Sequence, residues 1–261
     1  MIKLGARDHA AALGLYRASE ARFPLIGAVL LDEQDGAVYV DDPARPQQAY
    51  VEHAFGFAQL LGGPSAKFES ALERHLLIDR SFAAAKIRLY TPRLPAFLED
   101  ARYESLRSWR QRFIMDPAKL QGEDRTSAPA SLDTVIDDVD ESNIAVLEQA
   151  FGVTRRFWRN ASDFIEKANA VVVLHRGKPA SICYAAAQAD RQAEIDVLTR
   201  PEYQRLGLGK AAVMHFIQRC FKRGLAPVWD CFTNNDASMQ LSRSIGFTPK
   251  GSPYLFFTIG K

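Results

Sequence analysis

Residues 204–209, with the sequence Q-R-L-G-L-G, have the composition and the position of a phosphate-binding loop. They follow an apolar run with strand character, Ile195–Leu198, and they precede an apolar pattern with helical spacing. The amides in the first turn of a helix have no internal partners, and the helix dipole there favours an anion. Gly207 and Gly209 lack a Cβ, so the backbone can turn sharply and come close to a ligand.

Two nucleotide-binding motifs fit this loop less well. A Walker loop needs a glycine five residues before Gly209 and a serine or threonine after Lys210, where the chain has Ala211. The dinucleotide fingerprint G-x-G-x-x-G has Ala212 at its third glycine, which the fingerprint tolerates, so a nucleotide-binding enzyme stays an alternative. A glycine turn without any ligand also stays open, because glycines are common in turns.

The composition narrows the class of protein. Of the 261 residues, 47% are apolar and 25% are charged, as in globular domains. The net charge of +2 argues against a general nucleic-acid binder, so we expect no nucleic-acid partner. No apolar run approaches the ~20 residues of a membrane-spanning helix, and no signal peptide is recognisable. We therefore expect no membrane partner and a cytoplasmic location.

The cysteines favour the same setting. Cys183, Cys220 and Cys231 are odd in number and lie in apolar runs, which predicts buried, reduced thiols. Their spacing is not that of zinc ligands, so we expect no metal site.

Periodicity and turn residues predict two α/β halves joined by a polar linker over 116–130. In the first half we expect helices over 7–22, 66–79 and 94–98, strands over 26–31, 37–40 and 86–90, a strand pair or a strand and a helix over 49–61, and one or two strands over 103–115. In the second half we expect helical pieces over 131–168, a hairpin over 171–187, helices over 210–223 and 237–244, and strands over 227–232 and 254–259.

This pattern predicts an N-terminal α/β domain over residues 1–120 and a second domain over 131–261. Both halves have strands, a helix after a glycine break, a further strand, a short helix and a terminal aromatic strand. Residues 60–64, L-L-G-G-P, stand in the first half where the glycine loop stands in the second. A degenerate internal duplication and two unrelated domains are both compatible with this likeness.

A second motif follows the loop. Asn235-Asp236-Ala237-Ser238 lies at the start of a predicted helix that ends with Ile245-Gly246-Phe247. With Q/R-x-x-G-x-G/A at Gln204–Gly209 and the preceding hairpin, residues 131–261 resemble the GNAT superfamily of acyl-CoA-dependent N-acetyltransferases. Loop, asparagine and Gly-Phe agree in order and spacing.

Further residues resemble a two-part family of predicted GNAT acetyltransferases. They are Phe157-Trp158, Ala180-Ser181, Glu194-Ile195, Trp229-Asp230-Cys231 and the strand at Tyr254. The resemblance implies an α/β (α+β) fold in which a mixed, mostly antiparallel, splayed sheet is flanked by helices, with an N-terminal α/β half that could be a degenerate copy.

The resemblance also implies a function. An N-acetyltransferase would transfer the acetyl group of acetyl-CoA to a primary amine, which we expect to be that of a small molecule, by direct attack on the thioester. The alternative is a non-catalytic acyl-CoA-binding regulatory module. The expected partners are acetyl-CoA and the amine acceptor, with the chain a monomer or a homodimer.

The family pattern assigns the cofactor contacts to the strand before the loop, the loop itself and the later asparagine. The residues so implied are Val197, Leu198, Thr199, Gln204, Arg205, Leu206, Gly207, Leu208, Gly209, Lys210, Asn235 and Ser238. Solvated side chains at Arg205 and Lys210 are the alternative there, and Asn235 could also act as a helix cap.

The acceptor amine must be neutral to attack, so the site needs a group that takes a proton. In the family pattern a strand acid five residues before the asparagine often serves as base, and Asp230 has that place. Glu194 has the other common position, and Asp196 is a weaker third candidate. The alternative for each is an acid facing solvent or paired with a basic residue.

The chain departs from the family at one position. Many members have a tyrosine seven residues after the asparagine that protonates the leaving thiolate, and this chain has Ser242. A thiolate of pKa about 8.5 can leave without full protonation, so the change weakens only the acid assignment. Tyr203 or Tyr254 could substitute. Cys231 is expected to be a core thiol.

Overall fold

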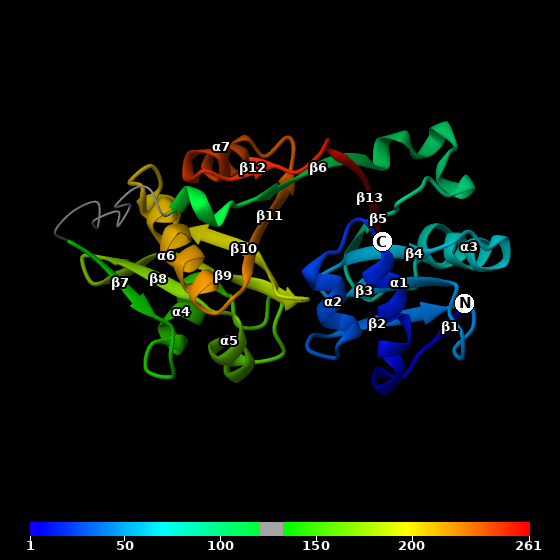
Figure 1. Cartoon of the computed structure of the whole chain (residues 1–261), viewed down its shortest axis with the longest axis horizontal. Helices are drawn as coiled ribbons and strands as arrows, with labels where there is room; N and C mark the ends of the chain where they lie inside the picture. The colour runs from blue at the N-terminus through cyan, green and yellow to red at the C-terminus, as the bar shows by residue number, and fades with distance from the viewer. Residues whose placement is uncertain (121–132) are drawn as a thin grey trace. The chain divides into compact units, whose positions relative to one another are not determined.

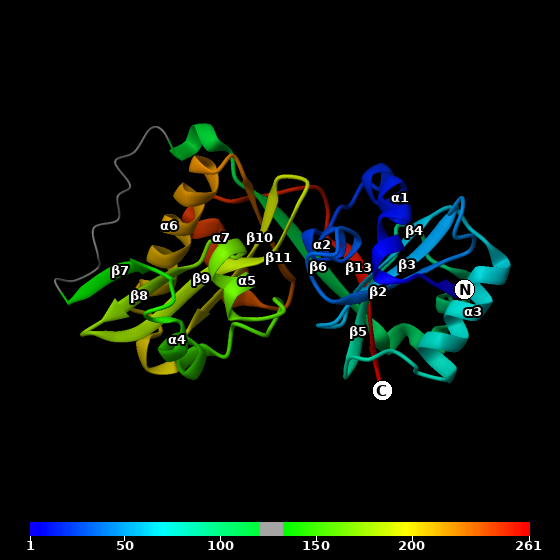
Figure 2. The same cartoon turned by 90° about the horizontal axis from the view of Figure 1, so that it is seen from below.

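The computed structural model describes residues 1–120 and 133–261 (Figure 1, Figure 2). The chain forms two compact units: one comprises Met1–Arg110 and Pro253–Lys261, and the other comprises Gln111–Ser252. Each unit has a β-sheet with helices packed on it.

The first unit contains short helices and an antiparallel meander. Its elements are β1 (Ile2–Lys3), η1 (Ala6–Ala12), α1 (Leu13–Ala18), α2 (Pro24–Leu30), β2 (Gly36–Val40), β3 (Gln48–His53), β4 (Phe57–Gly62), α3 (Ala66–Glu73), η2 (Arg74–Ile78), β5 (Lys86–Tyr90), η3 (Ala96–Leu98), η4 (Ala101–Leu106), the first residues of β6 (Arg107–Ile114) and β13 (Tyr254–Gly260). Neighbouring strands run in the order β1-β2-β3-β4-β5-β13-β6. The pair β4–β5 is parallel, and β1–β2, β2–β3, β3–β4, β5–β13 and β13–β6 are antiparallel.

Helices cover both faces of this sheet. Helix α2 packs on β2, β3 and β4. Phe68 and Leu72 of α3 and Leu76 of η2 form a core cluster with Tyr50 and Leu60 of the strands. The residues 26–31 were expected to form a strand, and this prediction is wrong because Pro24 fixes a helical φ at the first position of α2. All seven residues of α2 are buried, and such a short run shows no helical periodicity.

The second unit contains the glycine loop. Its elements are the end of β6, η5 (Pro117–Leu120), β7 (Thr134–Asp138), α4 (Ile144–Phe151), α5 (Ala161–Lys167), β8 (Val171–His175), β9 (Lys178–Ala189), β10 (Gln192–Thr199), η6 (Pro201–Tyr203), α6 (Leu208–Lys222), β11 (Ala226–Phe232), α7 (Asp236–Ile245) and β12 (Thr248–Pro249). Neighbouring strands run β6-β11-β10-β9-β8-β7, with β12 on β6. The pair β10–β11 is parallel, and β7–β8, β8–β9, β9–β10 and β6–β12 are antiparallel.

Helix α6 packs on β8, β9 and β10 (Figure 1). Its apolar residues, including Val213, Phe216 and Ile217, share one core with Trp229 and Cys231 of β11. The expected helix over 210–223 and the expected hairpin over 171–187 are therefore confirmed. Strand β7 was missed, because its residues T-V-I-D-D follow a polar stretch and alternate over only part of their length. Residues 121–130 of the predicted linker lie outside the described residues.

The compact units differ from the predicted domains at two places. Strand β13 belongs to the first unit, because it pairs with β5 over 86–90 and with β6 over 107–110. Residues 111–120 belong to the second unit, where Phe113 lies in the core beneath α6. Neither contact follows from the sequence order.

The two units share one order of elements. Three antiparallel strands, β2-β3-β4 or β8-β9-β10, precede a helix, and the strand after the helix pairs in parallel with the third strand. This shared order is what an internal duplication would produce.

In the described residues, no helix is long and apolar enough to cross a membrane.

His53 at the end of β3 is buried as a neutral ring. Its Nδ1 accepts from the Phe55 amide at 2.9 Å, and its Nε2 lies 3.1 Å from Oε1 of Gln34. An accepting Nδ1 requires the proton on Nε2, which then donates to Gln34. Burial lowers the pKa of His53 from 6.5 to about 4, against an opposing effect of the Asp35 charge. The folded chain therefore resists protonation of this ring.

We predict that folding stability decreases between pH 6.5 and about 4 with a contribution from His53. In this window the unfolded chain takes up a proton that the folded chain refuses, and the loss approaches about 3 kcal/mol. Urea unfolding of the wild type and of His53→Gln across this window measures it. The variant should be less stable at pH 7 and should show a shallower pH dependence; an equal slope would contradict the assignment.

Candidate functional site

The strands β10 and β11 part in the middle of their length. Their parallel pairing joins Gln192 to Ala226 and ends at Glu194–Val228. Strand β10 continues to Thr199, still paired with β9 on its other edge, and β11 continues to Phe232. On the side that faces β11, the main chain of residues 195–199 therefore lies past the last residue pair that joins the two strands. A sheet edge of this kind can pair with an extended ligand.

A β-bulge lies at the same point. Glu194 is opposite Ala187 and Ile195 is opposite Ala185, so β9 has one extra residue, Ala186. Nε1 of Trp158 donates to the Ala185 carbonyl at 3.0 Å, which fixes the irregular backbone from the side of α4 and α5. Bulges of this kind often redirect strands and side chains at functional sites.

The predicted phosphate loop leads from β10 to α6. Its residues 204–207 are exposed, and Arg205 and Gly207 have φ of 62° and 77°. Gly207 is the N-cap of α6 and provides no side-chain cap, and the first helical hydrogen bond runs from the Ala211 amide to the Gly207 carbonyl. The amides of residues 208–210 therefore have no carbonyl partner within the helix, and they stand at its positive end. Main-chain amides arranged in this way can bind an anion.

Gly209 is required for a different reason. A Cβ at this position would lie 2.9 Å from Oγ1 of Thr199, too close for either group. Oγ of Ser181 lies 2.9 Å from this same Oγ1 and donates to the Leu198 carbonyl at 2.9 Å. These hydrogen bonds join β9 to the end of β10, and the start of α6 packs closely on Thr199 because Gly209 has no Cβ. The strand edge and the helix N-terminus are thereby held as one surface.

Asn235 and Ser238 lie at the start of α7. Oδ1 of Asn235 accepts from the Ser238 amide at 3.1 Å, so the helix-cap interpretation of Asn235 is confirmed. Its amide NH₂ takes no part in that cap and can donate to a ligand. Oγ of Ser238 accepts from Nε1 of Trp229 at 3.0 Å, which ties α7 to β11.

The three candidate acids share one face of the sheet. Ile195 and Val197 of β10 and Trp229 and Cys231 of β11 pack in the core with α6. Side chains alternate along a strand, so Glu194, Asp196 and Asp230 lie on the opposite face. Glu194 and Asp230 stand on neighbouring strands, because Glu194 pairs with Val228, two residues before Asp230.

The surroundings of the acids differ. Asp230 has a fully covered side chain whose Oδ2 is 3.1 Å from Nε of Arg112 on β6. Asp196 accepts from the Tyr184 hydroxyl at 2.5 Å and lies 3.3 Å from Nε of Arg156. Burial, and then the Asp196 charge, raises the pKa of Tyr184, which keeps this hydroxyl a donor.

Glu194 is the acid nearest to the parting of the strands. It is the last residue of β10 that pairs with β11, it borders the bulge, and only 4% of its surface is exposed. Its carboxylate is therefore buried beside the strand edge on which a ligand could add.

The structure removes Ser242 from the list of possible proton donors to a ligand. It is fully buried, and its hydroxyl donates to the Met239 carbonyl at 3.0 Å. Tyr203 lies beside the loop, with its ring centroid 5.8 Å from that of His175. Tyr254 belongs to an aromatic cluster of the first unit with Phe23 and Tyr90. Cys231 is buried in the core, as expected.

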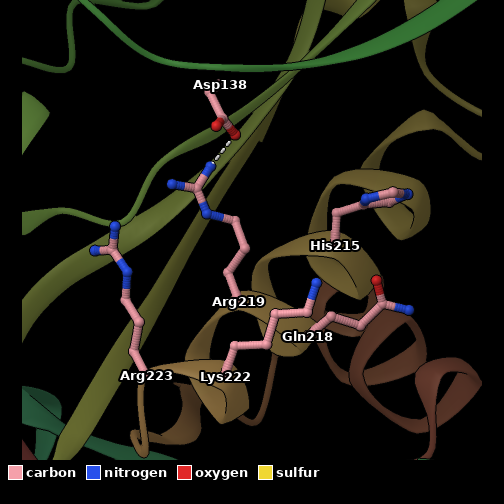
Figure 3. Close-up of a pocket in the computed structure, with 6 residues that line it drawn as sticks. All are labelled: Asp138, His215, Gln218, Arg219, Lys222 and Arg223. Atoms are coloured by element: carbon pink, nitrogen blue, oxygen red, sulfur yellow. Dashed lines mark hydrogen bonds and ion pairs between the residues drawn. The ribbon is translucent and has the colours of Figure 1, made fainter.

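Basic side chains line a hollow of about 380 Å³ along the second half of α6 (Figure 3). His215, Gln218, Arg219 and Lys222 belong to the helix, and Arg223 is its C-cap. Arg219 forms an ion pair with Asp138 of β7. Burial and the Lys222 charge lower the pKa of His215. Cations near a helix C-terminus are stabilised by the helix dipole. The clustering of these basic residues therefore does not require a bound ligand.

Several residues of the site were missed in the sequence. Arg112, Arg156, Ser181 and Tyr184 contact the predicted residues from three other strands or loops. Their proximity to the predicted residues can be recognised only when the register of the sheet is known.

Comparison with known proteins agrees with this geometry. The family model described as GNAT acetyltransferase matches residues 22–256. The chain belongs to this family. Two GNAT-related structures cover nearly the whole chain: a GCN5-related N-acetyltransferase-like protein from Streptococcus suis and a tandem GNAT protein from the clavulanic acid biosynthesis pathway. The first has 21% identity, a TM-score of 0.69, and coverage of 98% of this chain and 100% of that one.

The tandem protein has 12% identity and a TM-score of 0.64, and the match covers 99% of this chain and 97% of that one. At such identities the likeness shows the fold, a mixed and mostly antiparallel sheet with flanking helices, and this predicted fold class is confirmed.

Curated relatives match over shorter lengths. The uncharacterized N-acetyltransferase YdfB of Bacillus subtilis is 34% identical over 91 residues, 35% of this chain and 35% of YdfB. The ribosomal protein bS18-alanine N-acetyltransferase of Escherichia coli is 35% identical over 76 residues, 29% of this chain and 51% of that enzyme. The matches thus span about a third and about half of these relatives.

We predict that Gly207→Asp weakens CoA binding at least about a hundredfold, because a carboxylate would face the phosphates at the exposed helix N-terminus. Isothermal titration with CoA measures the effect. The matched control is Gly251→Asp, because Gly251 also has a left-handed φ, of 67°, and open space around its Cβ position. Equal CoA affinities of the two variants would show that the loop binds no pyrophosphate.

Proposed function

We propose that the chain is an acetyl-CoA-dependent N-acetyltransferase that acts on a primary amine of a small molecule. The observation that carries the proposal is the parting of β10 and β11 directly before a glycine loop and an uncapped helix N-terminus. The edge of β10 and the start of α6 lie together where Gly209 packs on Thr199. One extended ligand can pair with the strand edge and place its phosphates at the helix N-terminus.

The residues present fit CoA. In this proposal the main chain of Val197, Leu198 and Thr199 pairs with the pantetheine arm, as an added strand would. The amides from Arg205 to Lys210 bind the pyrophosphate, and the exposed side chains of Arg205 and Lys210 add positive charge. Gln204, Leu206 and Leu208 shape the loop, and Asn235 offers its amide NH₂ from α7.

Acetyl transfer from a thioester requires mainly that the acceptor amine lose a proton. A thioester is already activated, so the amine attacks once it has lost its proton. We infer that Glu194 receives this proton, directly or through water, because it borders the strand edge and the bulge. Asp230 then has a positioning role, since Arg112 occupies its Oδ2 within a covered ion pair.

The leaving thiolate does not require a side chain that donates a proton to it. Ser242 is committed to the Met239 carbonyl, and a thiolate can depart unprotonated and take a proton from water. Tyr203 stays a candidate donor because it lies beside the loop.

The first test is acetyl-CoA consumption with a panel of primary amines that includes small diamines, amino acids and a peptide with an N-terminal alanine. The peptide is included because one relative is described as acting on the alanine of a ribosomal protein. We expect turnover with at least one small amine. Turnover with the peptide alone would replace the proposed acceptor class, and tight CoA binding without any turnover would favour a regulatory module.

The second test separates the two acids. We predict that Glu194→Gln lowers kcat by about 10²–10⁴-fold with CoA affinity retained, the usual range for loss of a positioned base. Asp230→Asn should change kcat less than about tenfold but lower the melting temperature, because it leaves the Arg112 charge in a covered site. Steady-state kinetics and thermal unfolding of both variants measure this, and the opposite ranking in kcat would assign the base to Asp230.

A further inference from the structure

Three polar side chains of the first unit form a chain of contacts that the proposed acetyl transfer does not use. Oγ of Ser81 lies 2.8 Å from Nδ1 of His75. On the other side of the ring, Nε2 of His75 lies 3.5 Å from Oε2 of Glu52. A hydroxyl, an imidazole and a carboxylate in series are the constellation that activates a serine nucleophile.

The imidazole is held in one orientation. His75 is 8% exposed, and its ring lies against Tyr39 and Tyr50, with centroid distances of 5.1 and 5.8 Å. The Tyr50 hydroxyl donates to the Glu52 carboxylate at 2.8 Å. Burial, followed by the Glu52 charge, raises the pKa of Tyr50, so this donor stays protonated and keeps the carboxylate in place. Nε2 of His75 is buried and makes no hydrogen bond in the described residues; Oε2 of Glu52, at 3.5 Å, is the carboxylate oxygen that faces it.

The backbone around these residues is unusual at two points. His75 lies in η2, a π-helical turn over Arg74–Ile78, and such turns are frequent at functional sites. Arg80, directly before Ser81, has a φ of 46°, in the left-handed region that a non-glycine residue rarely adopts. Strain of this kind persists only where surrounding contacts enforce it, and it is concentrated at functional sites.

The constellation opens on a cavity. Ser81 and Glu52 line a hollow of about 280 Å³ together with Tyr39, His53 and Lys3. Nζ of Lys3 lies 5.9 Å from the centroid of the Tyr39 ring, so the hollow has a cation beside it. Ser81 is exposed, while His75 lies behind it. A small ligand can therefore reach the hydroxyl, and the imidazole is kept from solvent.

We propose that Ser81 is a nucleophile that accepts a small acyl group from an activated ester or thioester. Oγ bonds to the acyl carbon, its proton passes to Nδ1 of His75, and the bond to the alcohol or thiol breaks. The leaving group takes the proton from His75, and water then cleaves the acyl-serine in the same manner to release a carboxylic acid. Glu52 orients the ring, and the Lys3 ammonium is available to the oxyanion.

A purely structural role of Ser81 is the competing interpretation. The Ser81 amide donates to the His75 carbonyl at 3.1 Å, so the hydroxyl could simply complete the end of η2. That role predicts a loss of stability on substitution without any chemistry at Oγ, and the experiment is chosen to separate the two.

The test uses p-nitrophenyl acetate with the full chain. We expect a burst of p-nitrophenol, one acetyl group on the peptide that contains Ser81, and a loss of at least about a hundredfold in hydrolysis in Ser81→Ala. Ser244→Ala is the matched control, because this exposed serine bonds only to a backbone carbonyl in the described residues. His75→Gln should abolish the burst. Gly207→Asp should keep it, since the proposed CoA loop is not involved.

Acetylation at other residues, or equal hydrolysis by the wild type and Ser81→Ala, would overturn the proposal. His75→Gln could also unfold the first unit, so Glu52→Gln, which keeps the hydrogen bond from Tyr50, supplies a second variant; it should slow acylation without removing Ser81 labelling. Retention of N-acetyltransferase activity in Ser81→Ala would separate this chemistry from the proposed function.

Discussion

The end of the hydrogen-bond ladder between β10 and β11 determines the rest of the site. Main-chain amides and carbonyls need partners, and a pair of parallel strands normally supplies them along its whole length. Here pairing stops at Glu194–Val228 although both strands continue. The glycine loop and helix α6 follow directly on the edge that this stop creates.

Three neighbouring features accompany the parting of β10 and β11: a bulge, an ion pair and a glycine. The bulge at Ala185–Ala187 turns β9 and β10 locally, and Trp158 holds that turn. Arg112 ties β11 to β6 through Asp230, which draws the second strand to its other neighbour. Gly209 allows α6 to start against Thr199. The helix N-terminus is thus fixed relative to the edge by contacts that a single sequence does not display.

The parts of the site that follow from the sequence are the local ones. A glycine loop, a helix cap at Asn235 and the amphipathic pattern of α6 depend on residues a few positions apart. The misassigned and missed elements have a different cause. Helix α2 is short and buried all round, so no periodicity separates it from a strand, and β7 is defined by pairing with β8. Likewise, the partner of Asp230 lies 118 positions away, which no spacing rule reaches.

The first unit has a side-chain cap at the helix start that corresponds to the start of α6. At the corresponding helix start, Ser65 is the N-cap of α3, and its hydroxyl accepts from the Phe68 amide at 3.4 Å. The side chain thus takes one of the donors that the uncapped Gly207 leaves for a ligand. Gly62, before α3, has a structural reason to be glycine, because a Cβ there would lie 2.1 Å from the Gln47 carbonyl oxygen. If the halves arose by duplication, the first kept the order of strands and helix and replaced the phosphate cradle by an ordinary cap. The chemistry that we propose for the first unit lies elsewhere, at Ser81, His75 and Glu52.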